Sequence, residues 1–590
     1  MMIGSAARVA LWTTALVLLG SGVAGAQDRP NVILIVTDDQ GVGDFGVMGN
    51  PIIRTPHLDA MAARSARLDN FFVHPVCSPT RASLMTGRYN HRTGVIDTYI
   101  GRSMMKPSEV TVAEALSGAG YATGLFGKWH LGDCYPMRPQ DQGFEEVLMH
   151  RGGGLAQPSD PLENDRRYTD PILFENGEQV QKKGFCTDIY FEAALDWIDR
   201  CQEAERPFFA YIATNAPHGP FHDVPPDWLE QYRGRDLSNE RFPKTEGHPL
   251  PDNGNLDRRA RIFSMISNID DNVGRLFAKL SEHGILEDTL VILINDNGPN
   301  AYRYTGGYRG MKSDVFDGGI RSVFFAHWPG RLKGGHRSDR IAADIDMMPT
   351  ILGACGVAVP DEVALDGRNL MPLLEGAPKD WPDRTIVTQS HRGDVPVRYH
   401  HVAVRSQDWK LVHPTGFGRD DFEGPVKWQL YRVAKDPFEL ADVAQDHPEK
   451  VMELAAAYDR WFDDVAGERS FLPPRIVIGN PAEAATCLTR QDWRHLEGRK
   501  WGKDSVGQWL IEVERSGRFE AEVIRHPEDR GAGSVRLEWN EKTVQAEARE
   551  GAKSVIVGPI ELPTGPIDLI AVVEGETKWG AYQVVLRRVE

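Results

Sequence analysis

Four apolar segments rich in β-branched residues end abruptly in polar residues, and this repeated pattern constrains the fold more than any other feature of the chain. They span residues 31–37, 121–126, 208–214 and 289–295. A short apolar run without alternation indicates a strand that is buried on both faces. Apolar residues at steps of three and four over 262–280 indicate an amphipathic helix between the last two segments. Strands that alternate with helices predict an α/β fold, with a mostly parallel sheet covered by helices.

Polar side chains follow each predicted strand at the point where it ends. In a parallel sheet, ligands bind outside the carboxyl ends of the strands. We therefore expect these side chains to converge in space, although they are far apart in the sequence. They are Asp38 and Asp39, Lys128 and His130, Asn215 and His218, and Asp296 and Asn297.

The pattern of apolar residues and turns changes twice after this α/β segment. We predict a large α/β domain over 27–345, a smaller α+β part over 346–470 and an all-β, sandwich-like module over 471–590. The last boundary rests on Pro473 and Pro474, which begin a linker-like stretch before several short runs with alternating apolar residues.

The N-terminus has the pattern of a secretory signal peptide over residues 1–26. Arg8 precedes an apolar run from Val9 to Val23, and the small residues Ala24, Gly25 and Ala26 follow it. No other segment reaches the roughly 20 apolar residues of a membrane span. We expect an exported protein, periplasmic or secreted, with no membrane span in the mature chain. An uncleaved membrane anchor is the alternative.

The charge balance limits the partners of the protein. The chain has 84 acidic and 67 basic side chains, which gives a net charge of -17. This acidity argues against a nucleic-acid partner, which would require a basic surface. Any anion must therefore be held by a local cluster of cations. The six cysteines show neither a CxxC pair nor zinc-ligand spacing, and the sequence leaves their pairing open.

The segment around Cys77 predicts a short helix. Ser78 is a good N-cap, Pro79 suits the first helical position and Gly87 suits a left-handed stop. Cys77 would then lie just before the positive end of the helix, with Arg81 one turn further on. As a bare thiol, Cys77 has two interpretations, a nucleophile with a lowered pKa or an inert buried group.

The pattern Cys77-x-Pro79-x-Arg81, followed by Thr86-Gly87-Arg88, resembles the signature of type I sulfatases, in the alkaline phosphatase superfamily. This resemblance implies that a formylglycine-generating enzyme oxidises Cys77 to formylglycine, whose hydrate is the nucleophile. It extends over about residues 29–467. Asn295 stands where the family often has Ser or Thr, and Met311 where Gly is frequent. Further family motifs recur in the expected order: Asp38-Asp39, Gly127-Lys128-Trp129-His130, Pro217-His218, Asp296-Asn297-Gly298, Arg309-Gly310-Met311-Lys312 and Gly318-Gly319-Ile320-Arg321.

The resemblance also implies a metal site and a sulfate site. The expected metal ligands are all oxygen donors, which suits one Ca²⁺ per chain better than Mg²⁺, because Mg²⁺ demands tighter octahedral geometry. They are Asp38, Asp39, Asp296, Asn297 and an oxygen of the modified Cys77. Five positively charged or titratable side chains would surround the sulfate group: Arg81, Lys128, His130, His218 and Lys312. No cluster of His and Cys suggests zinc.

These roles predict a sulfatase mechanism. One hydroxyl of the hydrate attacks sulfur, and His218, aided by Lys312, protonates the departing alcohol. His130 takes the proton of the second hydroxyl, and sulfate leaves by elimination. Alternatives are an arylsulfatase of small aryl sulfates, a phosphonate or phosphodiester hydrolase with the same site, and a sulfated-glycan-binding protein whose hydrolytic site is idle.

Export together with a possible glycan-binding module favours a sulfated carbohydrate as substrate. Charged side chains predicted near the pocket mouth would contact a sugar or else lie on the surface: Arg151, His391, Arg392 and Arg398. Four tryptophans of the β module would stack on sugar rings or else pack in its core: Trp493, Trp501, Trp539 and Trp579.

Overall fold

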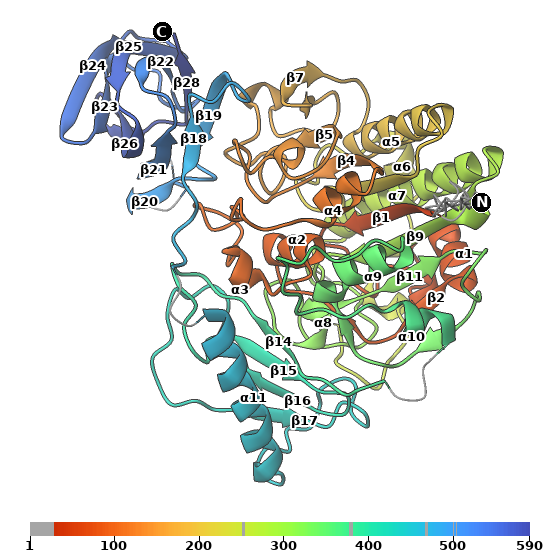
Figure 1. Cartoon of the computed structure of the whole chain (residues 1–590). Helices are drawn as coiled ribbons and strands as arrows, with labels where there is room; N and C mark the ends of the chain where they lie inside the picture. The colour runs from red at the N-terminus through yellow and green to blue at the C-terminus, as the bar shows by residue number, and fades with distance from the viewer. Residues whose placement is uncertain are drawn as a thin grey trace, which may run out of the picture.

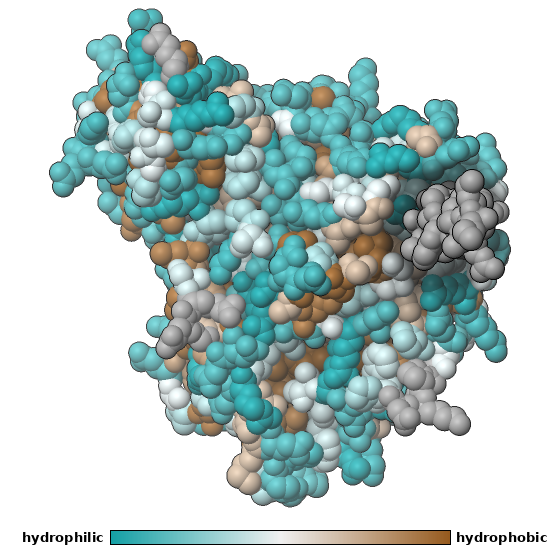
Figure 2. Space-filling model, in the orientation of Figure 1, coloured by the Kyte–Doolittle hydropathy of each residue, from teal (hydrophilic) through white to brown (hydrophobic). Residues whose placement is uncertain are grey.

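The computed structural model of the chain describes residues 29–250, 254–376, 381–466, 470–498, 501–502 and 504–589 (Figure 1). The predicted signal peptide lies outside these residues. Among them, no helix combines the length and the hydropathy of a membrane span. Figure 2 shows that one face of the molecule is largely hydrophilic, with hydrophobic side chains gathered in small areas.

A large mixed sheet forms the centre of the molecule and confirms the predicted fold class. Its middle strands are parallel in the order β9-β1-β8-β4-β5. Strands β11, β2 and β12 extend it on one side, and β6 and β7 on the other. The bounds are β9 Thr289–Asn295, β1 Asn31–Thr37, β8 Phe208–Ala213, β4 Ala122–Lys128, β5 Glu146–His150, β11 Phe324–His327, β2 Ala66–Leu68, β12 Arg337–Ser338, β6 Ile172–Glu175 and β7 Glu178–Gln181.

Helices cover both faces of this sheet. Along β1, Val32 and Leu34 pack in one core, whereas Ile33 and Ile35 pack in another. Because both faces of β1 are buried, its sequence is a continuous apolar run rather than an alternating one. The first core includes α2 (Cys77–Thr86), α4 (Val112–Gly118), α9 (Met347–Ala354) and α10 (Met371–Gly376), and the second includes α1 (Pro56–Arg64), α5 (Cys186–Glu203) and α7 (Leu256–Glu282).

A second, antiparallel sheet follows in the chain. It has the order β14-β15-β16-β17, and α11 (Pro448–Ala466) packs on it through Leu454 and Tyr458. A buried carboxylate joins this sheet to the main part. Asp317, at the start of α8 (Asp317–Ile320), contacts Lys410 of β16 at 2.6 Å and Arg405 of β15 at 3.2 Å. The strand bounds are β14 Ile386–Gln389, β15 Val402–Arg405, β16 Lys410–His413 and β17 Gln429–Tyr431.

Replacement of Asp317 by Asn is expected to destabilise this junction. Burial alone would raise the pKa of Asp317, but Lys410, Arg405 and Arg321 lower it below the ordinary value. Since the folded pKa lies below the unfolded one, the carboxylate stabilises the fold at neutral pH, and this contribution is lost as the pH falls from about 4 through the folded pKa. We expect Asp317→Asn to cost about 3–5 kcal/mol at pH 7, because it leaves buried cations without their counter-charge.

Thermal unfolding measures this effect. The Tm of Asp317→Asn should lie below that of the wild type at pH 7. The difference between the two Tm values should become smaller as the pH falls below about 4. Glu453→Gln, at an exposed ion pair with Lys450 on α11, is the control and should change the Tm little. Equal Tm values for the Asp317→Asn variant and the wild type at pH 7 would contradict the assignment.

Two further sheets form the C-terminal β region (Ile476–Arg588). One has the order β18-β21-β26-β23-β24 with β20 and β27 beside it, and the other has the order β19-β28-β22-β25. Both sheets contribute to one core, which also takes in Ile100, Met104 and Met137 from the α/β part. The bounds are β18 Ile476–Ile478, β19 Ala485–Thr489, β20 Arg494–Glu497, β21 Val506–Val513, β22 Gly517–Ile524, β23 Gly533–Trp539, β24 Lys542–Ala548, β25 Ser554–Leu562, β26 Gly565–Glu574, β27 Lys578–Gly580 and β28 Gln583–Arg588.

Two of the four tryptophans proposed to stack on sugars are core residues. Trp493 is fully buried and packs against Trp509, and Trp539 is also buried. Trp501 packs edge-on against Tyr99 of the α/β part, with ring centroids 5.0 Å apart. Trp579 is half-buried beside His526. All six cysteines are free, so the structure contains no disulfide among them.

Candidate active site

Three carboxylates and a thiol meet at the carboxyl edge of the main sheet. Asp38 and Asp39 follow β1, Asp296 follows β9, and Cys77 begins α2. All four side chains are buried, and one ligand atom of each lies within 4.8 Å of the others. Asp39 has a left-handed backbone with φ 62°, an uncommon conformation outside glycine that clusters at functional sites. The predicted convergence of strand-end residues is therefore present.

Helix α2 begins two residues earlier than predicted. Val76, in an extended conformation, is the N-cap, and Cys77 itself is helical. The Ser78 hydroxyl is buried and has no hydrogen-bond partner among the described residues, so the expected Ser78 cap is wrong: the residue already lies inside the helix. Gly87 ends the helix at φ 66°, as predicted. The Thr80 hydroxyl donates to the carbonyl oxygen of Asp296 at 2.7 Å and so ties α2 to the end of β9.

The carboxylate cluster fits a hard cation. Asp39 Oδ2 and Asn297 Oδ1 are both buried and have no hydrogen-bond partner within the described residues. Asn297 Nδ2 donates to Asp39 Oδ1 at 2.8 Å, which orients the amide and leaves its oxygen free. Free buried oxygens beside two further carboxylates form the donor set that Ca²⁺ or Mg²⁺ prefers.

Three cations surround the carboxylates and the thiol. Arg81 Nη2 contacts Asp296 Oδ2 at 2.8 Å, and Lys128 Nζ contacts Asp38 Oδ2 at 2.6 Å. Lys312 Nζ bridges two groups, because it lies 2.5 Å from Asp39 Oδ1 and 3.4 Å from Cys77 Sγ. An acidic protein thus concentrates positive charge at this one edge, as an anion site requires.

Two histidines complete the cluster. His218 Nε2 lies 3.8 Å from Asp39 Oδ2, and His218 Nδ1 lies 2.7 Å from the Gly219 carbonyl oxygen. His130 has a left-handed backbone with φ 60°, and its Nε2 lies 2.8 Å from the Thr98 carbonyl oxygen. The structure therefore gathers every predicted site residue around the end of β1.

Burial controls the titration of this site. Burial and the nearby Asp38 raise the pKa of Cys77 to about 12, which argues against a bare thiol nucleophile with a lowered pKa. Burial also lowers the pKa of His218 to about 4 and that of His130 well below its ordinary value. Desolvation and the neighbouring Lys128 and Lys312 thus move the pKa of both imidazoles below the ordinary value of about 6.5.

Sequence reasoning missed the residues that hold the two histidines. A Cβ on Gly153 would lie 2.4 Å from His130 Cε1, and one on Gly154 would lie 3.2 Å from His218 Nδ1. The three successive glycines at 152–154, separated from β5 by Arg151 alone, were the available signal. The Tyr211 hydroxyl, which accepts from Arg81 Nη1 at 3.2 Å, gave no signal because it lies inside a buried strand.

Most charged side chains predicted near the pocket mouth have other partners. Arg398 pairs with Asp459 of α11 at 2.9 Å. Arg151 is buried over the Phe174 ring, and His391 Nε2 accepts from the Val397 amide. Arg392 also has a partner, since it forms an ion pair with the buried Asp97, and its Nη1 lies 3.3 Å from the Thr98 hydroxyl.

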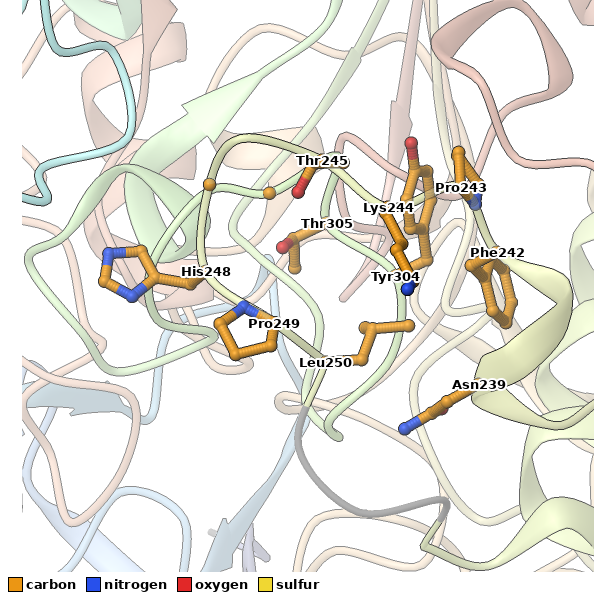
Figure 3. A pocket seen from close by; sticks show the side chains of 12 residues that line it. Asn239, Phe242, Pro243, Lys244, Thr245, His248, Pro249, Leu250, Tyr304 and Thr305 are labelled. Atoms are coloured by element: carbon orange, nitrogen blue, oxygen red, sulfur yellow. The ribbon is translucent and has the colours of Figure 1, made fainter.

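A cavity of ≈ 360 Å³ lies beside the site but holds none of the predicted catalytic residues (Figure 3). Residues 239–250 and 304–307 line it, and Phe242 stacks on Tyr304. The preceding residue, Arg303, donates to the Asp39 carbonyl oxygen at 2.6 Å. The cavity is therefore a neighbour of the cluster and not its centre.

Comparisons with known proteins agree with this geometry. Residues 30–357 match the sulfatase family, and residues 311–459 match the C-terminal part of N-sulphoglucosamine sulphohydrolase. N-acetylgalactosamine-6-sulfatase of Canis lupus familiaris is 33% identical over 414 residues, which cover 65% of this chain and 73% of the relative. Arylsulfatase A of Homo sapiens is 33% identical over 485 residues, which cover 74% and 89%.

A solved structure shows the same architecture. The crystal structure of Ps i-CgsB superimposes with a TM-score of 0.63 and 26% identity, and covers 75% of this chain and 95% of that one. This chain belongs to the sulfatase family, within the alkaline phosphatase superfamily. It is a sulfuric ester hydrolase.

Replacement of Gly153 by Ala is expected to displace the His130 ring. The added Cβ would lie 2.4 Å from Cε1 and 2.7 Å from Nε2, so the ring must move. Because a misplacement of about 1 Å can cost about 100-fold in rate, we expect kcat to fall between 10- and about 100-fold with little change in Tm. Gly118→Ala, where an added Cβ meets nothing within 4 Å, is the matched control. An unaltered kcat for Gly153→Ala would show that the ring position is unimportant.

Proposed function

We propose that the protein hydrolyses a sulfate monoester of a carbohydrate, with formylglycine at position 77 and one calcium ion. The observation that carries this proposal is the meeting of Asp38, Asp39, Asp296 and Cys77 within 4.8 Å, with Lys312 beside the sulfur atom. The family implies a metal ion and formylglycine. The oxygen-only donor set, with its free Asp39 and Asn297 oxygens, favours Ca²⁺ over softer metals.

Asp38, Asp39, Asp296 and Asn297 would hold the cation. Bound there, Ca²⁺ would supply positive charge for the oxygens of the sulfate group and of the nucleophile. The hydrate of formylglycine would supply two hydroxyls on one carbon, one to attack sulfur and one to allow sulfate to leave by elimination.

The cations of the site bind and orient the substrate. Lys312 lies 3.4 Å from Cys77 Sγ, so its ammonium group can reach an anion held next to position 77. Lys128, at the carboxyl end of β4, would neutralise charge on the sulfuryl oxygens. Arg81 is fixed by Asp296 and by the Lys128 carbonyl oxygen at 3.0 Å, so it orients the group at position 77 without moving.

The histidines move protons. His218, next to Asp39, would donate a proton to the departing alcohol oxygen, with Lys312 as helper. Burial lowers the pKa of His218 to about 4 although Asp39 raises it, so the acid form of His218 needs further stabilisation from the bound anion. His130, which burial keeps neutral, would accept the proton of the remaining hydroxyl.

A carbohydrate substrate is supported by relatives. Ps i-CgsB has also been solved in complex with k-i-k-neocarrahexaose, at 26% identity to this chain. The relative from Canis lupus familiaris is named for a sulfated amino sugar. Arg392, beside Thr98 and paired with Asp97, would be a contact for a sugar hydroxyl.

Substrate comparison tests the proposal. We expect kcat/KM for 6-sulfated N-acetylgalactosamine or another sulfated sugar to exceed that for an aryl sulfate, and both to exceed that for an aryl phosphodiester. A preference for the aryl sulfate would make the protein an arylsulfatase, and a preference for the phosphodiester would overturn the sulfate assignment.

The organisation of the chain completes the proposal. We propose that 27–345 and 346–470 form the sulfatase domain and its smaller part, and that 471–590 is an accessory module. The sequence of residues 1–26 supports export to the periplasm or the exterior, where a sulfated glycan is accessible. Maturation would require a formylglycine-generating enzyme as partner.

A further inference from the structure

The C-terminal β region reaches the active site through one loop. Between β19 and β20, this loop carries Gln491, which is 1% exposed. Gln491 Nε2 lies 2.8 Å from the Thr98 carbonyl oxygen and 3.3 Å from His130 Nε2. Figure 1 shows the C-terminal β region against the β5 and β7 side of the main sheet. A residue 361 positions away in the sequence thus touches a proposed catalytic histidine.

The Thr98 carbonyl oxygen fixes the tautomer of His130. A carbonyl oxygen can only accept, so His130 Nε2, at 2.8 Å, carries the proton. The other ring nitrogen, Nδ1, is buried and has no hydrogen-bond partner among the described residues, and it keeps its lone pair. The amide nitrogen of Gln491 faces Thr98, because the flipped amide would set two acceptor oxygens against each other.

Further contacts hold the carbonyl oxygen in place. The Gly101 amide donates to the Gln491 carbonyl oxygen at 3.0 Å, and Gln491 Nε2 also contacts Ser103 Oγ at 3.4 Å. Arg494, in β20, donates to the Ile100 carbonyl oxygen at 3.1 Å. The C-terminal β region therefore holds the segment 98–103, and with it the acceptor for His130.

We propose that Gln491 is a positioning residue for His130: through the Thr98 carbonyl oxygen it fixes Nε2 as the protonated nitrogen and Nδ1 as the base. The inference rests on the proposed function. There, His130 acts only in the second half of the reaction, in which the remaining hydroxyl gives its proton to Nδ1, a C=O bond forms and the C–O bond to sulfate breaks. In the first half, the S–O bond to the alcohol breaks and His218 supplies the proton.

This division gives the inference a kinetic test. Gln491→Met keeps the length of the side chain but cannot donate to Thr98. Because kcat/KM reports the steps up to departure of the alcohol, it should stay unchanged in this variant. Both kcat and KM should fall together by about tenfold or more. This loss is a modest share of the 10²–10⁴-fold contribution that is typical of acid–base groups. The peptide that carries position 77 should gain the mass of one sulfo group during turnover.

Controls separate positioning from packing. Gln545→Met, on exposed β24 of the same region, should change none of these values. Gln491→Leu, which also cannot donate to Thr98, should behave as Gln491→Met. Partial unfolding lowers kcat and kcat/KM equally, so it cannot imitate the expected result.

Two results would overturn the inference. One is an unchanged kcat in both Gln491 variants. The other is an equal loss of kcat and kcat/KM, with no sulfo group on the peptide that carries position 77. Wild-type protein that turns over no sulfate ester would overturn the proposed function itself, and this inference with it.

Discussion

The Cys77→Ser variant is expected to transfer at most one sulfo group per protein molecule and then stop. A serine hydroxyl can attack sulfur, but it leaves no second hydroxyl on the same carbon, so elimination of sulfate is impossible. Lys312, Lys128 and Arg81 remain in place around position 77, so the first step keeps its electrostatic support. We expect multiple turnover to fall by about three orders of magnitude or more.

Rapid mixing with a chromogenic sulfate ester measures this outcome. The variant should release no more than one alcohol per chain, and the peptide with position 77 should retain a sulfo group. Cys77→Ala, which has no nucleophile, is the matched control and should show neither burst nor mass gain. Sustained turnover by Cys77→Ser would refute the two-hydroxyl scheme.

The Asp39→Asn variant is expected to lose both the calcium ion and the activity. Asp39 Oδ2 is buried and accepts no hydrogen bond from the described residues, and the substitution removes the charge of the carboxylate while keeping its shape. The affinity of a calcium site depends on its ligand charge. Since loss of an outer partner of a metal site already costs 10- to 100-fold, loss of a ligand should lower metal affinity and activity by about 100-fold or more.

Elemental analysis and calcium titration of activity measure this effect. One Ca²⁺ per chain is expected for the wild type and far less for Asp39→Asn, with activity partly restored by excess Ca²⁺. Asp271→Asn, in an exposed position of α7 within a second acidic group, should keep the full metal content. Wild-type calcium content in Asp39→Asn would contradict the assignment of Asp39 as a ligand.

The sequence predicts the centre of the site better than its surroundings. Asp38 and Asp296 could be placed together because parallel strands end at one edge, whatever the details of packing. Gly153, Thr98 and Gln491 could not, because their contacts with His130 depend on how loops and a distant β region fold over that edge. No local periodicity in the sequence predicts the conformation of these loops.

The titration behaviour of the site also required the structure. The sequence supplies ordinary pKa values for His130 and His218, but the His130 ring is buried and the His218 ring largely buried, both near lysines. Desolvation therefore decides their charge, and it depends on the tertiary packing. The N-cap of α2 is Val76 and not the predicted Ser78. The helix begins at Cys77 itself, whose Sγ lies 3.5 Å from Asp38 Oδ1, a tertiary contact that the local sequence does not reveal.

Mass spectrometry of the peptide that bears Cys77 tests the central claim most directly. The protein is made together with a formylglycine-generating enzyme, and the peptide is compared with that from protein made without it. We predict that the first peptide has exchanged its thiol for an aldehyde or its hydrate, in proportion to the sulfatase activity of each sample. Full sulfatase activity in a sample whose Cys77 is wholly unmodified would contradict the account.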